Sequence, residues 1–232
     1  KEIQAVARGL LAAGVRPGCH VAMQIENCPE QAFVALALNA IRAVKVPVNI
    51  SLSARELGFV LSQSESEFLV TGCTIKLKQG ETGVKKIITL PGAQCDTDLP
   101  ITGWEDFLAA GEGFELSESE DEAYADEPSD IIYTSGSTKA PKGVVLTHDM
   151  LMRSAFASCM NRGFEIGRRV FVPLPMFHVY GYVEGMLAAI LVGGAVLLKK
   201  GKFQAEPGLD FMEESGANDI LSVPSQMMAL IS

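Results

Sequence analysis

The segment 134–143, TSGSTKAPKG, concentrates groups that can bind an anion. In ten residues it holds four hydroxyl side chains, two glycines and two lysines. Glycine lets backbone N–H groups approach oxyanions closely, serine and threonine hydroxyls are further donors, and Lys142 adds a positive charge. Pro141 restricts the loop, so less entropy is lost when an anion orders it. The segment therefore suits a polyphosphate.

The segment differs from a Walker A loop in its spacing and in its flanks. The Walker A pattern is GxxxxGK(S/T) between a strand and a helix, whereas here five residues separate Gly136 from Lys142. We expect a strand at 130–134 before the loop and a second strand at 144–147 after it. Loop amides, hydroxyls and lysine would then hold the anion without a helix dipole. On composition alone, an ordinary hairpin loop is the alternative interpretation.

Short β-branched runs alternate with helical patterns in the first part of the chain, and these elements must position the loop. Such alternation is typical of an α/β fold. Ser53 with Glu56, and Thr102 with Glu105, have the spacing of a capping box, which predicts two helix starts. A further helix is expected from Pro29. The expected strands lie at 21–25, 44–48 and 68–71.

The most apolar stretch, 185–198, predicts a buried helix rather than a membrane span. A spanning helix needs roughly 20 apolar residues, and this stretch is shorter and contains Gly193 and Gly194. We expect the helix to end at these glycines and a strand to follow at 195–198.

The composition describes a folded, acidic chain. With 232 residues and 48% hydrophobic content, it can bury a core as one domain or as two subdomains, which we place at 1–160 and 161–232. The formal charge of −9 argues against a nucleic-acid partner, because a phosphate backbone requires a concentrated basic face. The acidic run 112–130 predicts a solvated connector, and a partner-binding acidic segment is the alternative.

The cysteines and histidines give little sign of metal or disulfide chemistry. Five cysteines without a CxxC pair cannot close a complete disulfide framework, and they favour a reduced, cytoplasmic setting. Three histidines without ligand spacing argue against a zinc site. We interpret His148, which follows the expected helix cap Thr147, as structural. His20 is expected in a turn, without a partner.

The loop and its surroundings resemble a known family. TSGSTKAPKG followed by VVLTH is similar to (S/T)SG(S/T)TGxPKGV, the phosphate-binding signature of the adenylate-forming enzymes. Further segments of the chain resemble that family, namely GVRPGCHVAM, NCPEQAFVALALNAIRAVKVPVN, SARELGFVLSQSESEFLV, LPMFHVYG and DILSVPSQMMAL. The resemblance implies layered α/β sheets, as in the large N-terminal domain of an acyl-CoA synthetase. We expect that domain to be incomplete at both ends here and the C-terminal domain to be absent.

The resemblance also implies a reaction and its cofactors. The family activates a carboxylate with ATP to an acyl-adenylate, releases pyrophosphate, and in many members transfers the acyl group to the thiol of CoA. Magnesium would arrive with ATP. The residues that would hold the β- and γ-phosphates are Thr134, Ser135, Gly136, Ser137, Thr138, Lys142 and Gly143.

A second motif, LPMFHVYG, implies an acyl pocket. By resemblance, His178 would orient the reacting carboxylate, and Phe177, Tyr180 and Gly181 would shape the pocket around it. On general grounds a lone histidine beside aromatic residues is a packing residue, and only the motif favours the catalytic role. The motif favours acyl- or aryl-CoA ligases over peptide-synthetase adenylation domains. The expected substrate is therefore a fatty or aryl acid without an amino group.

The chain departs from the family pattern at three positions. Lys139 and Arg42 stand where the family has glycine, and Cys19 stands where it has aspartate. A lysine at positive φ would add strain of about 1 kcal/mol. These departures support an alternative function, a non-catalytic nucleotide- or acyl-binding module. Because the family's adenine, magnesium and terminal-lysine motifs are not found within the sequence, we expect this chain alone to form no acyl-adenylate.

Overall fold

The computed structural model describes residues 1–116, 124–134 and 141–232. The chain divides into two compact units, the first made of Lys1–Ile25 and Glu30–His148, the second of Glu26–Pro29 and Asp149–Ser232. This division falls between His148 and Asp149, whereas the sequence suggested one near residue 160. The difference arises because helix α5 (His148–Arg162) makes its contacts within the second unit.

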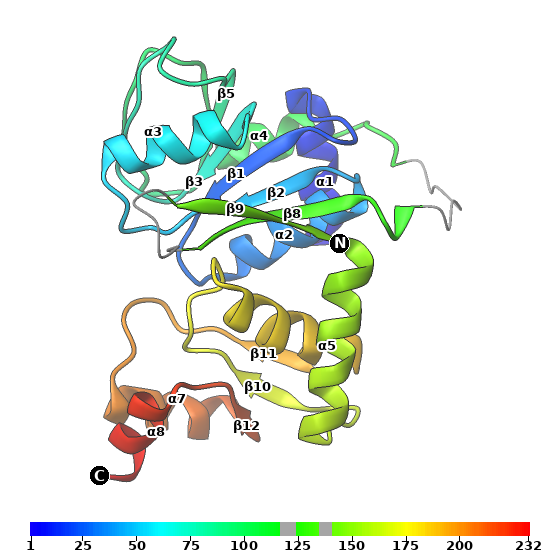
Figure 1. Ribbon diagram of the computed structural model, residues 1–232, viewed down its shortest axis with the longest axis vertical. Coiled ribbons are helices and arrows are strands. Elements are labelled where there is room, and N and C mark those ends of the chain that lie inside the picture. Colours follow the sequence, from blue (N-terminus) through cyan, green and yellow to red (C-terminus); the bar gives the residue numbers. More distant parts are fainter. Residues whose placement is uncertain (117–123, 135–140) are drawn as a thin grey trace. The chain divides into compact units, whose positions relative to one another are not determined.

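The first unit is built on a seven-stranded sheet with the order β7-β5-β3-β1-β2-β8-β9. Neighbouring strands pair in parallel except β8 and β9, which are antiparallel and form one edge (Figure 1). The strands are β1 (His20–Gln24), β2 (Val44–Pro47), β3 (Phe68–Thr71), β5 (Lys86–Thr89), β7 (Ile101–Gly103), β8 (Pro128–Thr134) and β9 (Lys142–Thr147). The α/β alternation expected from the sequence is confirmed. A separate two-stranded sheet pairs β4 (Ile75–Lys76) with β6 (Cys95–Asp96).

Helices connect and cover these strands. They are α1 (Glu2–Ala13), α2 (Pro29–Ala40), α3 (Ala54–Gln63) and α4 (Trp104–Ala110). The capping box of α3 is confirmed, because the Ser53 hydroxyl accepts the Glu56 N–H while the Glu56 carboxylate accepts the Ser53 N–H. Buried aliphatic side chains from α3 and from the central strands, among them Leu57, Leu61 and Leu69, form one continuous core.

Two expectations for this unit are wrong. Thr102 caps no helix, because β7 extends through it in pairing with Ile88, and α4 begins after Gly103 without a side-chain cap. His20 lies in β1 rather than in a turn, and its Nδ1 lies 2.5 Å from the carbonyl oxygen of Ser64. Both errors concern residues whose partners lie elsewhere in the sequence.

The second unit contains a small parallel sheet of order β11-β10-β12. Its elements after α5 are β10 (Arg169–Phe171), the π-helix η2 (Tyr180–Leu187), α6 (Ala188–Leu191), β11 (Ala195–Leu197), α7 (Ala205–Ser215), β12 (Asp219–Ile220) and α8 (Pro224–Ile231). A helix before Gly193 is confirmed, although it begins as the π-helix η2 and its last residues, Ile190 and Leu191, are exposed rather than buried. The strand after Gly194 is confirmed as well. The part of the chain that the structure describes holds no helix long and apolar enough to cross a membrane.

Candidate functional site

The predicted phosphate loop joins the two strands of the β8–β9 hairpin. Thr134 and Lys142 are register partners across this antiparallel pair, and both are exposed. Ser135, Gly136, Ser137 and Thr138, together with Lys139, lie outside the described residues. The structure therefore brings the two ends of the motif together at the open edge of the sheet, where an anion can reach them.

Gly143 is required by packing across the hairpin. It lies opposite Tyr133, and a Cβ at this position would come within 2.8 Å of Ile131 Cγ2 and 3.3 Å of the Tyr133 ring. Ile131 is 9% exposed and belongs to the core, so it cannot move freely. The glycine of the motif thus has a structural reason that is independent of any bound phosphate.

Replacing Gly143 with alanine should lower the free energy of unfolding by about 1–3 kcal/mol, the usual penalty for overpacking. Gly58 is the matched control, because it lies inside α3 and a Cβ there meets nothing within 4 Å. Gly58→Ala should stabilise the protein by up to about 1 kcal/mol through helix propensity. Urea unfolding of both variants measures the two effects, and a Gly143→Ala protein as stable as the parent would contradict the packing role.

A buried polar network lies at the base of the hairpin. Lys45 Nζ is 2.9 Å from Asp130 Oδ2, and the two side chains are only 1% and 0% exposed. Lys45 also donates to Ser129 Oγ at 3.2 Å and to Asn39 Oδ1. Asp130 Oδ1 is buried and has no hydrogen-bond partner among the described residues. Lys45 and Asp130 are also register partners between β2 and β8, so the ion pair lies where the hairpin joins the sheet.

No sequence motif identifies this network. The feature of the sequence that points to the network is Lys45, a charged residue inside the otherwise apolar strand at 44–48. A charged side chain is almost never fully buried unless it is paired, so Lys45 in a buried strand requires a partner of opposite charge. No local pattern identifies Asp130 as that partner, because the pair is 85 positions apart in the chain.

Arg42 adopts the backbone conformation that the family's glycine would favour. Its φ is 58°, in the left-handed region. The guanidinium forms an ion pair with the Glu127 carboxylate and lies 5.7 Å from the centre of the Tyr124 ring. The hydrogen bond from Arg42 holds the pKa of Glu127 below its usual value. The arginine thus offsets part of its backbone strain with contacts that glycine cannot make.

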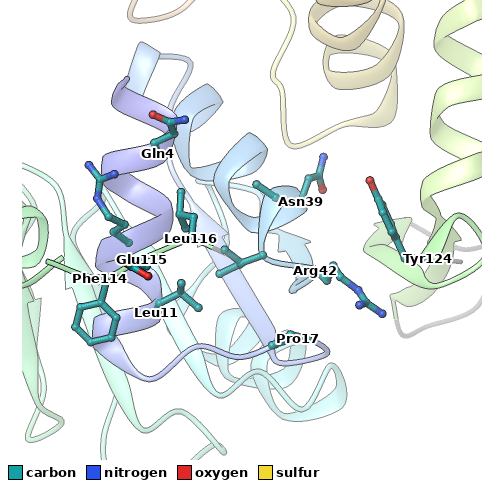
Figure 2. Close-up of a pocket in the computed structure, with 12 residues that line it drawn as sticks. Gln4, Leu11, Pro17, Asn39, Arg42, Phe114, Glu115, Leu116 and Tyr124 are labelled. Atoms are coloured by element: carbon teal, nitrogen blue, oxygen red, sulfur yellow. The ribbon is translucent and has the colours of Figure 1, made fainter. Parts of the chain in front are cut away.

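Arg42 and Tyr124 also border a cleft of about 850 Å³ in the first unit (Figure 2). Figure 2 shows Asn39 from the last turn of α2, Arg42 from the turn after α2, Leu11 from α1, and Tyr124 near Arg42. The cleft is wide, and its lining mixes apolar side chains with charges of both signs. None of the described residues assigned to the phosphate loop or to the acyl pocket lines it.

The acyl-pocket motif lies in the second unit, at the start of η2. The Phe177 and His178 rings have centroids 4.5 Å apart, and the His178 N–H donates to the Pro175 carbonyl oxygen at 3.2 Å. His178 as a residue is exposed, yet its ring is partly buried, and this burial lowers its pKa below the ordinary value. The imidazole is therefore neutral at neutral pH and can accept or donate one hydrogen bond.

Gly181 permits a close approach inside this motif. A Cβ at Gly181 would lie 2.6 Å from the Pro175 carbonyl oxygen and 3.0 Å from that of Leu174. Only glycine fits where the first turn of η2 meets this segment. Tyr180 begins the π-helix and is exposed. Short π-helical turns often occur at functional sites, and no periodic pattern in the sequence predicts this one.

Acidification should destabilise the protein through His148 and His178. Burial lowers the pKa of His178, and burial together with nearby Lys45 lowers that of His148. The folded state then binds fewer protons than the unfolded state below about pH 6.5, so stability is present above that value and is lost as pH falls. Urea unfolding at pH 7.5 and 5.5 should show a loss that a His148→Gln/His178→Gln variant lacks. An equal loss in that variant would contradict the assignment.

Metal and disulfide chemistry find no support in the described residues. Within them, no group of three or more His, Cys, Asp or Glu side chains could hold a metal ion. The five cysteines, all among the described residues, form no disulfide with one another. The predicted phosphate-site residues belong to the first unit and the predicted acyl-pocket residues to the second.

Comparison with known proteins identifies the class. A family model described as AMP-binding enzyme matches residues 1–232. The chain therefore belongs to the AMP-binding enzyme family. It is 32% identical over 229 residues to a probable CoA ligase of Humulus lupulus, covering 93% of this chain and 41% of that protein. It is 30% identical over 235 residues to an oxalate–CoA ligase of Arabidopsis thaliana, covering 96% and 43%.

Solved structures share the fold. A long-chain-fatty-acid-CoA ligase from Archaeoglobus fulgidus superposes with a TM-score of 0.79 at 26% identity, covering 99% of this chain and 45% of that one. The O-succinylbenzoate coenzyme A synthetase of Bacillus subtilis, in complex with AMP, gives 0.79 at 24% identity, with 99% and 55% covered. The chain thus spans about two fifths of these curated relatives, and its α/β fold matches the corresponding part of the solved structures.

Proposed function

We propose that this chain supplies the ATP-phosphate-binding hairpin and part of the acyl pocket of an AMP-forming acid–CoA ligase. The observation that carries the proposal is the pairing of Thr134 with Lys142, which brings the two exposed ends of the family's phosphate motif together. Membership of the AMP-binding family and the CoA-ligase names of its relatives support the same activity.

The hairpin fits a triphosphate by the chemistry of its donors. Lys142 places a positive charge at the end of the hairpin next to the loop, and the Thr134 hydroxyl is a further donor. We assign the loop residues Ser135, Gly136, Ser137 and Thr138, with Gly143, to the same cradle. Donors fixed before the reaction stabilise negative charge as it develops on the leaving pyrophosphate. Magnesium, entering with ATP, would supply further charge stabilisation.

His178 would orient the substrate carboxylate. Its lowered pKa keeps the ring neutral at physiological pH, so it can hydrogen-bond a carboxylate without forming a permanent ion pair. Phe177, Tyr180 and Gly181 would form the adjoining pocket. We propose a fatty or aryl acid as substrate, CoA as acyl acceptor, and the cytoplasm as location, which the odd number of cysteines without a CxxC pair favours.

Binding and turnover are tested separately. Calorimetry should detect ATP·Mg²⁺ binding to the 232-residue chain, and we expect no pyrophosphate release with ATP, magnesium and a panel of fatty and aryl acids. Release of pyrophosphate would show that the chain alone is catalytic. In a version extended to the length of the relatives, binding without turnover would favour the alternative, a non-catalytic nucleotide- or acyl-binding module. Absence of ATP binding in both would overturn the proposal.

A further inference from the structure

The side-chain amide of Asn27 uses all of its hydrogen-bonding groups to contact one segment of backbone. Its Nδ2 donates to the carbonyl oxygens of Leu174 at 2.7 Å and Val172 at 3.2 Å, and its Oδ1 accepts the Met176 N–H at 2.9 Å. Asn27 belongs to the second unit although almost 150 positions separate it from these residues in the sequence. An amide carries two N–H donors and one carbonyl acceptor, and all three are used here.

The bonded segment leads directly into the His178 turn. Val172, Leu174 and Met176 are buried, so their backbone groups have little access to water. The His178 N–H donates to the carbonyl oxygen of Pro175, which lies between two of the residues that Asn27 holds. The position of the His178 ring therefore depends on where the segment 172–176 lies.

The first turn of η2 contacts the same segment. Gly181 approaches the carbonyl groups of Leu174 and Pro175 so closely that a Cβ would clash at 2.6–3.0 Å. The Tyr182 N–H donates to the His178 carbonyl oxygen at 3.0 Å, which ties the turn to the helix. The segment 172–176 is thus in contact with Asn27 and with η2, and the His178 turn follows it.

We propose that Asn27 is a positioning residue for the acyl pocket, holding the segment 172–176 so that His178 presents its ring to the substrate carboxylate. The positional part rests on these hydrogen bonds, and only the link to the carboxylate rests on the proposed function. No other side chain of similar size supplies two donors and one acceptor from this point. Leucine matches the shape but none of the hydrogen bonds, and aspartate would face two carbonyl oxygens with a carboxylate.

The test compares Asn27→Leu with Asn218→Ala in the 232-residue chain. Asn218 is the matched control, because its Oδ1 accepts the Arg169 N–H at 2.8 Å and so makes a side-chain bond to backbone elsewhere in the same unit. In Asn27→Leu, we expect hydrogen exchange at the Met176 amide at least tenfold faster and a shifted His178 ring signal in NMR spectra. Asn218→Ala should change neither.

An unchanged Met176 exchange rate and His178 signal in Asn27→Leu would overturn the positioning role. If Asn27→Leu does not fold, Asn27→Ser is tested instead. Serine lacks both amide N–H donors but keeps a small polar group, and the same two signals are measured. Octanoate and benzoate, added to the parent chain, then test the link to function through the His178 signal. If Asn27→Leu changes Met176 exchange and the His178 signal, but neither acid shifts the His178 signal of the parent chain, the positioning role stands and the proposed acyl pocket is contradicted.

Discussion

Replacing Lys45 with methionine should lower the free energy of unfolding by about 3–5 kcal/mol, the loss that follows when one partner of a buried ion pair is removed. Asp130 would remain fully buried without its cation, and its Oδ1 already has no hydrogen-bond partner among the described residues. The effect should be local to the junction of β2 with β8. Urea unfolding monitored by circular dichroism measures it.

Two further variants make this prediction specific. The double variant Lys45→Met/Asp130→Leu should recover most of the lost stability, because apolar residues of similar volume often replace a buried pair without loss. Lys76→Met should change stability little, since the Lys76–Asp96 pair, at 3.2 Å, is exposed on both sides. If the double variant is as unstable as Lys45→Met, the loss does not come from the unpaired charge of Asp130 alone, and the prediction is contradicted.

Replacing Lys142 with alanine should weaken ATP binding by roughly 10- to 100-fold. A hydrogen bond to a charged group contributes about 1.5–3 kcal/mol, and about 1.4 kcal/mol corresponds to a factor of ten in affinity. Because the side chain is exposed, the fold should be unaffected. Calorimetric titration with ATP·Mg²⁺ measures the change.

The control for Lys142 is Lys78→Ala, which removes an exposed lysine of the same unit outside the proposed site. It should leave ATP affinity within twofold of the parent. Equal weakening by both variants would mean that ATP responds only to net charge. Unchanged affinity in Lys142→Ala would remove the lysine from the phosphate site.

Local patterns predicted the elements well. The strand at 68–71 has the predicted bounds, α2 begins at Pro29, and the Ser53–Glu56 capping box forms as expected. Each of these signals is contained in a few consecutive residues. The two strands around the phosphate motif were predicted for the same reason, because two β-branched runs flank a segment rich in turn-forming residues.

Features that depend on distant partners were not predicted. Asp130 as the partner of Lys45, and Asn27 as the residue that holds the segment before His178, follow only from the tertiary fold. Thr102 had the sequence of a cap, but pairing with Ile88 kept it in a strand. Arg42 occupies a position where the family has glycine, and its pairing with Glu127 accompanies the left-handed backbone. In each case a non-local interaction outweighed the local preference.

The most direct test of the proposed function places a paramagnetic ion beside the nucleotide phosphates. With Mn²⁺ in place of Mg²⁺, bound ATP should broaden the backbone amide signals of Thr134, Lys142 and Gly143, and leave those of β5 at the opposite side of the sheet unaffected. Broadening confined to other residues, with these three signals unchanged at saturating ATP, would contradict the assignment of the hairpin as the phosphate site.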